Sequence, residues 1–288
     1  MPSLLKQIKK IFKSKKTTTP ASPAASKPVV AAAPVAAVAA VAPVLKTPIA
    51  KVSEPAHPEN THTNHTFAAL AKSDAQLAPF ANHKYTKVVS AERVEAARAG
   101  LEKSGFKVHL VNSRGEAFET IKNLIPAGAS VNNAHSTTLE EIGFITYLKG
   151  ETAWDNVHAT ILAEKDPAKQ AELRRTIGAT VDYYLTSMSA VTEDGKIAHA
   201  DLSGSKVGGV AFGAANVIVV VGTNKIVKDE DEAWTRTNEF ALAAESARAR
   251  DAYGVPASAI VNFEVLRQVS PFTPGRIQVV LVNDALGF

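Results

Sequence analysis

The stretch "NVIVVVGTNK", residues 216–225, decides the fold class. Its β-branched residues run without a break between Asn216 and Gly222. A strand that lacks polar alternation is typical of a parallel sheet with both faces covered by helices. Asn224 and Lys225 follow directly, and ligands of open α/β sheets bind beyond the carboxyl ends of the strands. The stretch therefore predicts a central strand with a candidate site at its end.

Helical and strand-like segments alternate on both sides of this strand. Their limits are well marked, as at Asp166 and Pro167, which begin a helix that Gly178 ends. This alternation predicts an α/β protein with a mixed, mostly parallel sheet flanked by helices. The expected helices are 91–103, 115–125, 166–178 and one that begins within 228–233 and ends at 251; the expected strands are 106–111, 129–134, 183–192, 196–200, 216–222 and 276–284.

Charge divides the chain into two parts. The first 53 residues carry nine lysines and no acid, and the remainder has a net charge of −5. We expect residues 1–65 to form a basic, Ala/Pro-rich disordered tail, because this composition offers little apolar surface to bury. Residues 3–16 are predicted to form a short amphipathic helix within the tail. The α/β domain is expected to span residues 66–288.

The basic tail is the part of the chain from which the location of the protein and some of its partners are predicted. Its amphipathic helix has three possible roles: a frayed start, attachment to an anionic membrane surface, or an organellar import signal. The uncharged stretch 28–45 is not expected to span a membrane, because it is mostly alanine and contains two prolines. We expect a cytoplasmic protein, or a mitochondrial one if the tail directs import. Nucleic-acid binding is not expected, because the tail offers no element that would read a groove.

The chain has no cysteine. This excludes disulfides, thiolate zinc sites, cysteine nucleophiles and cysteine-ligated iron–sulfur clusters within it. His57, His62 and His65 lie in a polar stretch that reads better as a linker than as a metal site. No metal and no cofactor are therefore expected.

The first candidate site is "NNAHSTTLEEIG", residues 132–143, in which three hydroxyl residues lie between a strand and a helix. They match a capping-box pattern, which favours a purely structural role, but a helix start can also bind an anion. We expect one of Thr137 and Thr138 to cap the helix while Ser136 faces a ligand. Glu140 is interpreted as structural and Glu141 as a candidate catalytic acid. Gly143 within the helix suggests close backbone packing.

The second candidate site is "TEDGKIAHADLSGS", residues 192–205. The "EDG" sequence predicts a hairpin turn, which explains Asp194 and Gly195 without any function. Glu193 and Asp201 are candidate general acids or bases, although both could simply be polar turn residues. The glycine-rich stretch 207–213 matches no nucleotide-binding pattern.

The third candidate site lies at the carboxyl end of the predicted central strand, residues 216–222. Lys225 could hold an anionic substrate or polarise a carbonyl group, and Asn224 could contact the same anion. A solvated surface lysine is the alternative.

In their order, "STTLEEIG", "YYLTSMSAVTEDGKIAHADLSGSKVGGVAFGAANVIVVVGTNKIVKDEDEAWTR" and "GRIQVVLVNDALGF" resemble the lactate-utilisation (LUD) domain family. The resemblance implies the fold of sugar-phosphate isomerases and CoA transferases, and a part in oxidising L-lactate to pyruvate with iron–sulfur partner proteins. Lacking cysteine, the chain resembles the cluster-free type. The positions that the resemblance carries over are Ser136, Thr137, Thr138, Glu141, Glu193, Asp194, Gly195, Asp201, Gly204, Asn224 and Lys225.

Two functions follow from these observations. In the first, the domain binds a small anionic metabolite in lactate or related organic-acid metabolism, as an enzyme or as a subunit with an iron–sulfur oxidoreductase partner. In the second, the protein is a non-catalytic scaffold or regulator that its basic tail recruits to acidic surfaces. The polar clusters at strand ends favour the first.

Overall fold

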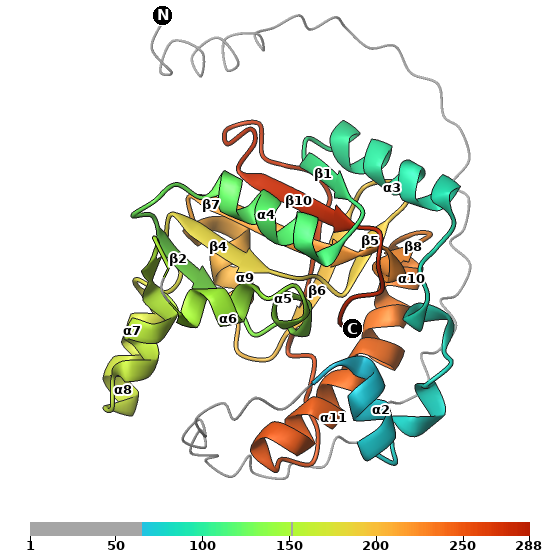
Figure 1. The fold of residues 1–288 in the computed structure, drawn as a ribbon, viewed down its shortest axis with the longest axis horizontal. Helices are drawn as coiled ribbons and strands as arrows, with labels where there is room; N and C mark the ends of the chain where they lie inside the picture. The colour runs from blue at the N-terminus through green and yellow to red at the C-terminus, as the bar shows by residue number, and fades with distance from the viewer. Residues whose placement is uncertain (1–64, 151) are drawn as a thin grey trace, which may run out of the picture. The chain divides into compact units, whose positions relative to one another are not determined.

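The computed structural model describes residues 65–150 and 152–288 (Figure 1). The predicted helix at 3–16 and the rest of the basic tail lie outside these residues. The division of the chain at residue 65 therefore stays a prediction.

Six parallel strands form the main sheet of the described chain. Their spatial order is β1-β10-β7-β4-β2-β3, and every neighbouring pair runs in the same direction. The strands are β1 (Lys107–Val111), β2 (Ser130–Asn133), β3 (Asp155–Asn156), β4 (Tyr183–Thr186), β7 (Asn216–Gly222) and β10 (Ile277–Val282). The predicted central strand is thus β7, which lies between β10 and β4. The α/β class with a mostly parallel sheet is confirmed.

A second sheet contains the antiparallel pairs. Its order is β8-β5-β6-β9, with β8 (Ile226–Val227), β5 (Ala190–Thr192), β6 (Ile197–Asp201) and β9 (Asn262–Leu266). The hairpin predicted at "EDG" joins β5 to β6. The prediction of one strand over 183–192 is wrong, because the chain leaves the parallel sheet after Thr186 and joins the second sheet from Ala190 onward. Strand β9 was not predicted.

Helices cover the parallel sheet and extend beyond it. They are α2 (Phe67–Ser73), α3 (Ala91–Lys103), α4 (Arg114–Leu124), α5 (Thr137–Glu141), α6 (Phe144–Lys149), α7 (Val157–Ala163), α8 (Pro167–Arg175), α9 (Ser205–Gly208), α10 (Glu230–Thr235) and α11 (Leu242–Tyr253). A π-helical segment, η5 (Arg236–Ala241), joins α10 to α11 within the single helix predicted there. No helix in the described part of the chain is both long and apolar enough to cross a membrane.

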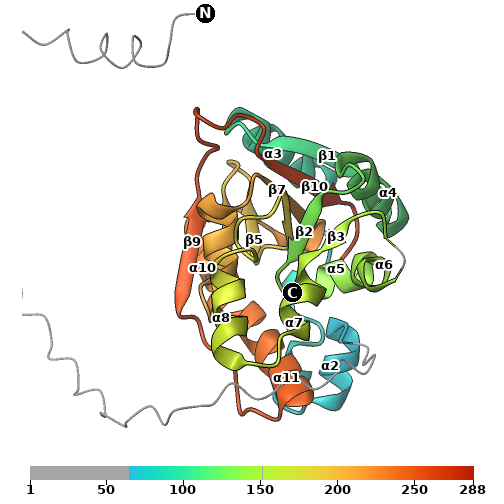
Figure 2. The same ribbon diagram turned by 90° about the vertical axis from the view of Figure 1, so that its left-hand side faces the viewer.

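Both faces of β7 are buried, as its sequence predicts. Val217, Val219 and Val221 join a core that includes α3, α7 and part of the second sheet. Ile218 and Val220 join the core beneath α4, α5 and α6. Figure 2 shows β9 and α6 on opposite sides of the parallel sheet. Burial of alternate residues in two cores explains the unbroken apolar run.

Gly143 does not provide the close backbone packing that the sequence suggested. It has φ +81°, and a Cβ atom built there would meet nothing within 4 Å. Its role is to take up a left-handed conformation that separates α5 from α6, rather than to permit close backbone packing. The helix expected after Ser136 is consequently only five residues long.

Close packing is found instead between α3 and the β5–β6 hairpin. A Cβ atom on Gly100 would lie 2.6 Å from the Glu193 carbonyl oxygen, and one on Gly195 would lie 2.0 Å from Gly100 backbone atoms. The two glycines therefore allow the helix and the turn to touch backbone to backbone. Gly195 also has φ +87°, which a β-carbon would disfavour.

The contact between α3 and the hairpin should reverse the usual gain in stability when alanine replaces a helical glycine. Helix propensity alone would make Gly100→Ala more stable by about 1 kcal/mol, but the clash should lower the free energy of unfolding by about 1–3 kcal/mol. Gly115→Ala in α4 is the matched control, because the nearest atom to its added Cβ is 4.0 Å away. Chemical denaturation of both variants measures the difference. Equal stabilities for the two would contradict the contact.

Candidate anion-binding site

Four neighbouring strands end at the same edge of the parallel sheet. The chain after β2 leads to Thr138, after β4 to Ser187, after β7 to Lys225 and after β10 to residues 285–288. These strands are adjacent in the order β10-β7-β4-β2. Residues that are far apart in the sequence are therefore brought together at the edge where α/β sites form. In Figure 1 the C-terminal end of the trace lies beside α5.

Lys225 is the centre of this group. Its Nζ atom donates to Thr138 Oγ1 at 3.1 Å, Ser187 Oγ at 3.1 Å and the Phe288 backbone oxygen at 3.0 Å. The residue is 1% exposed, and no Asp or Glu side chain of the described residues lies within 4 Å of Nζ. The alternative of a solvated lysine is thereby excluded.

The electrostatic surroundings work against the charge on Lys225. Burial lowers the pKa of Lys225 well below its ordinary value, and the nearby positive charge of Arg236 lowers it further. Glu141 opposes both effects from beyond contact distance. In its protonated form, a buried amine held by exchangeable oxygen atoms is a position at which an anion would be stabilised.

The predicted polar residues converge on a segment of the chain itself. Asn224 Oδ1 accepts from the Leu286 amide at 3.1 Å, and Glu141 Oε2 accepts from the Gly287 amide at 3.1 Å. Together with the contact from Lys225, three predicted side chains thus hold residues 286, 287 and 288 in succession. Residues 285–288 are called the covering segment below.

Glycine at position 287 lets the covering segment approach closely. A Cβ atom there would lie 2.4 Å from Thr138 Oγ1 and 3.3 Å from Lys225 Nζ. Burial raises the pKa of Glu141, and the Gly287 amide only partly offsets that effect. Glu141 therefore protonates more readily than an exposed glutamate, which is a useful property for a proton carrier.

The start of α5 differs from the expectation. Ser136 is the N-cap, and its hydroxyl accepts from the Leu139 amide at 3.3 Å. Thr138 instead points to Lys225, and Thr137 Oγ1 is buried without a hydrogen-bond partner among the described residues. Ser136 and Thr138 have thus exchanged the expected roles, because the cap falls one residue earlier than the Thr-x-x-Glu pattern indicates.

Arg236 is a functional candidate that sequence reasoning missed. It is 0% exposed, at the start of η5, and its Nη1 atom donates to the Ser189 carbonyl. The guanidinium carbon lies 5.3 Å from the Tyr85 ring centre and 5.2 Å from that of Phe240. Burial lowers the pKa of Arg236 to about 9, which leaves it charged at neutral pH. Nothing in "EAWTRTNEF" distinguishes this arginine from a surface one.

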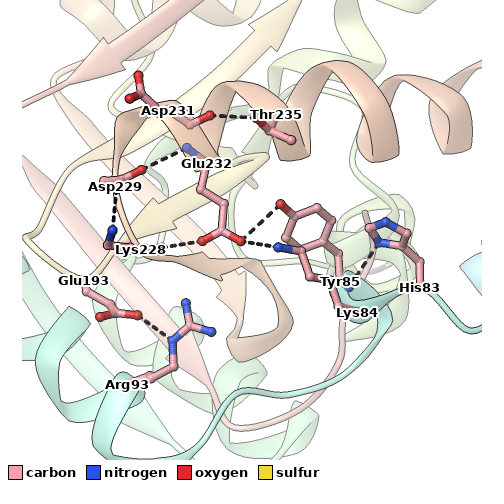
Figure 3. Close-up of polar contacts among 10 residues, drawn as sticks. All are labelled: His83, Lys84, Tyr85, Arg93, Glu193, Lys228, Asp229, Asp231, Glu232 and Thr235. Atoms are coloured by element: carbon pink, nitrogen blue, oxygen red, sulfur yellow. Dashed lines mark hydrogen bonds and ion pairs between the residues drawn. The ribbon is translucent and has the colours of Figure 1, made fainter.

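The second predicted site does not contact Lys225. Glu193 pairs with Arg93 of α3, as Figure 3 shows. Asp194 accepts from Lys196 Nζ at 2.7 Å and from the Thr192 hydroxyl, and these contacts lower its pKa. Both acids belong to the hairpin turn, and Gly195 supports the contact with α3 described above. The geometry matches the alternative of polar turn residues.

Comparison with known proteins identifies the family of this chain. The model of the LUD domain matches residues 94–282, which include all six strands of the parallel sheet. The chain belongs to the LUD domain family. Among solved structures, this LUD protein is similar to a DUF162 family protein from Deinococcus radiodurans, with 15% identity and a TM-score of 0.37. That match covers 68% of this chain and 99% of the other. No curated protein matches the sequence.

Asp201 and Gly204 have structural partners in the LUD domain. Asp201 accepts from the amides of Ser203, Lys206 and Val207, at 2.9, 2.7 and 3.2 Å. Burial alone would raise the pKa of Asp201, but these donors lower it overall. Gly204 has φ +83° at the N-cap of α9. Asp201 therefore fixes the turn into α9.

His199, two residues before Asp201, is the deepest titratable group of the second sheet. It is 0% exposed, and its Nε2 atom lies 3.4 Å from Glu264 Oε2 on β9 without hydrogen-bond alignment. Burial lowers the pKa of His199 to about 3. The residue is therefore neutral in the folded protein across the physiological range.

His199 should make the stability of the LUD domain depend on pH. The unfolded chain takes up a proton near pH 6.5 and the folded chain only near pH 3, so stability falls as the pH drops between these values. We expect the wild type to lose about 2 kcal/mol more than His199→Gln between pH 7 and 5. Urea denaturation at both pH values measures this. Equal losses would show that His199 is protonated in the folded state.

Proposed function

We propose that this LUD domain binds a small organic-acid anion at Lys225, and that this binding is its part in lactate utilisation. Family membership supports a role related to lactate utilisation. The observation that carries the proposal is the buried Lys225 amine, which two hydroxyl groups and the Phe288 oxygen surround without any Asp or Glu side chain of the described residues.

The contacts of Lys225 suggest how the anion would be held. The Phe288 backbone oxygen marks a position at which an oxygen atom binds the ammonium group. A carboxylate oxygen of the ligand would take this position once the covering segment moves aside. Thr138 and Ser187 would keep Nζ in place, so that little reorganisation accompanies binding.

Oxidation of L-lactate to pyruvate releases two electrons and two protons. Lys225 would hold the substrate carboxylate, and Glu141, with its raised pKa, is the proposed proton carrier. The electrons require an acceptor, and an iron–sulfur oxidoreductase is the partner that we propose. Recruitment of the protein to an anionic membrane through residues 3–16 is a separate proposal, as is the tail–domain division at residue 65.

Lys225→Met tests the site, because methionine keeps the apolar length of the side chain and removes the charge. We expect it to weaken binding of L-lactate and pyruvate about tenfold or more, measured by isothermal titration calorimetry. The variant should also be less stable by about 1–3 kcal/mol, since Thr138, Ser187 and Phe288 lose their shared donor, so binding is measured well below its melting temperature.

Lys228→Met is the control, because its side chain is 78% exposed three residues away. It should bind both acids as the wild type does. Unchanged affinity of Lys225→Met would refute the proposed site, as would an equal loss in the two variants. If Lys225→Met does not fold, Thr138→Val and Ser187→Ala should each weaken binding instead, and wild-type affinity in both would again refute it.

A further inference from the structure

The guanidinium group of Arg236 has one edge without a partner. Its Nε and Nη2 atoms are buried and have no hydrogen-bond partner among the described residues, whereas Nη1 is bonded to Ser189. Buried N–H groups of a charged side chain are costly to leave unpaired. An unpaired edge of this kind indicates a position at which the acceptor atoms of a ligand would bind.

The same edge holds a carboxylate elsewhere in this protein. Nε and Nη2 of Arg250 donate to Asp74 at 2.6 and 2.9 Å, and those of Arg248 donate to Glu245 at 2.9 and 2.6 Å. Arg267 holds Glu230 in the same way, at 2.9 and 2.8 Å. Two parallel donors match the two oxygens of a carboxylate or phosphate. Arg236 presents the same pair of donors, Nε and Nη2, without a bound carboxylate among the described residues. This pair of donors is called the fork below.

The aromatic neighbours do not replace the missing acceptor. The Tyr85 and Phe240 rings contact Arg236 by cation–π interactions, which act on the charge and leave the in-plane N–H groups of the fork unsatisfied. Arg236 also begins a π-helical segment, and such segments occur frequently at functional sites.

Arg236 and Lys225 belong to one group. Lys225 contacts Ser187, and Arg236 contacts Ser189 two residues later on the same strand connection. Phe288 joins them from the other side, because its backbone oxygen contacts Lys225 while its ring packs in the cluster of Tyr85 and Phe240. Phe288 therefore contacts Lys225 directly and packs in the same cluster as the two rings that contact Arg236.

We propose that the ligand of this site carries a second anionic group, a carboxylate or a phosphate, that the Nε–Nη2 fork of Arg236 binds while Lys225 holds the first. This inference rests on the proposed function, since it assigns the class of the anion that binds at Lys225. Phe288 is only partly buried, and the proposal requires that its displacement admit the ligand to both cations. A dianion would match the two positive charges, whereas a monoanion would leave one uncompensated.

A matched set of 2-hydroxy acids tests the ligand class on the full chain. L-lactate carries one carboxylate, L-malate carries a second carboxylate, and 3-phospho-L-glycerate carries a phosphate in addition to its carboxylate, all with the same configuration at C2. The last two acids, which have two anionic groups each, are called dianions below. Calorimetric titration of the wild type should give at least about tenfold tighter binding of one or both dianions than of L-lactate. The better of the two dianions distinguishes a carboxylate subsite from a phosphate subsite.

Two variants, Arg236→Gln and Arg236→Lys, separate the contribution of the fork to binding from that of the positive charge. Arg236→Gln should bring dianion affinity to within about threefold of the affinity of the same variant for L-lactate. Arg236→Lys keeps the charge without the fork and should retain part of the preference. Arg267→Gln is the control, because it also removes an arginine fork, but one whose side chain is 68% exposed.

The outcomes distinguish this inference from the proposed function. If L-lactate binds the wild type as tightly as both dianions, the second subsite is refuted while the Lys225 site stands. If the dianion preference survives in Arg236→Gln, Arg236 is not the subsite. If none of the three acids binds, the proposed function fails and this inference fails with it. The wild-type comparison decides the ligand class even if neither Arg236 variant folds.

Discussion

The buried ammonium group of Lys225 is the interaction on which the carboxyl edge of the sheet depends. Removing a lysine charge from water costs several kcal/mol unless polar groups replace the water. The protein supplies these groups from the chain that follows three other strands: Thr138 after β2, Ser187 after β4 and Phe288 after β10. One side chain therefore ties four parallel strands together at their ends. The same atom carries the positive charge that would attract a ligand.

This double role explains why the candidate site is covered rather than open. The covering segment forms hydrogen bonds with Lys225, Asn224 and Glu141, and in the proposed function a ligand takes the place of these contacts. Binding would then exchange one set of hydrogen bonds for another, instead of adding contacts to an empty surface. Specificity in such an exchange comes from groups that the segment leaves unsatisfied. Arg236 is such a group, since its fork has no acceptor among the described residues.

Local sequence predicted the fold better than it predicted the site. The unbroken β-branched run identified β7, and glycine and proline signals placed α3 and α8 to within a few residues. Lys225 could be found because it directly follows a buried strand. Glu193 and Asp201 have similar local surroundings, but the hairpin and α9 direct them to other partners. Ser187 and Arg236 carry no local signal, because their positions arise only when the second sheet and η5 pack beside the strand ends.

The central claim is that Lys225 is a charged group that exchanges the covering segment for an anion. Nuclear magnetic resonance of protein labelled with ¹⁵N at lysine Nζ and at backbone amides tests it directly, with Lys225→Met to assign the signal. We predict an ammonium signal for Lys225 at neutral pH, and addition of L-lactate should shift both that signal and the Gly287 amide signal. A neutral amine at Lys225, or L-lactate binding that leaves both signals in place, would show that Lys225 does not bind the anion in this way.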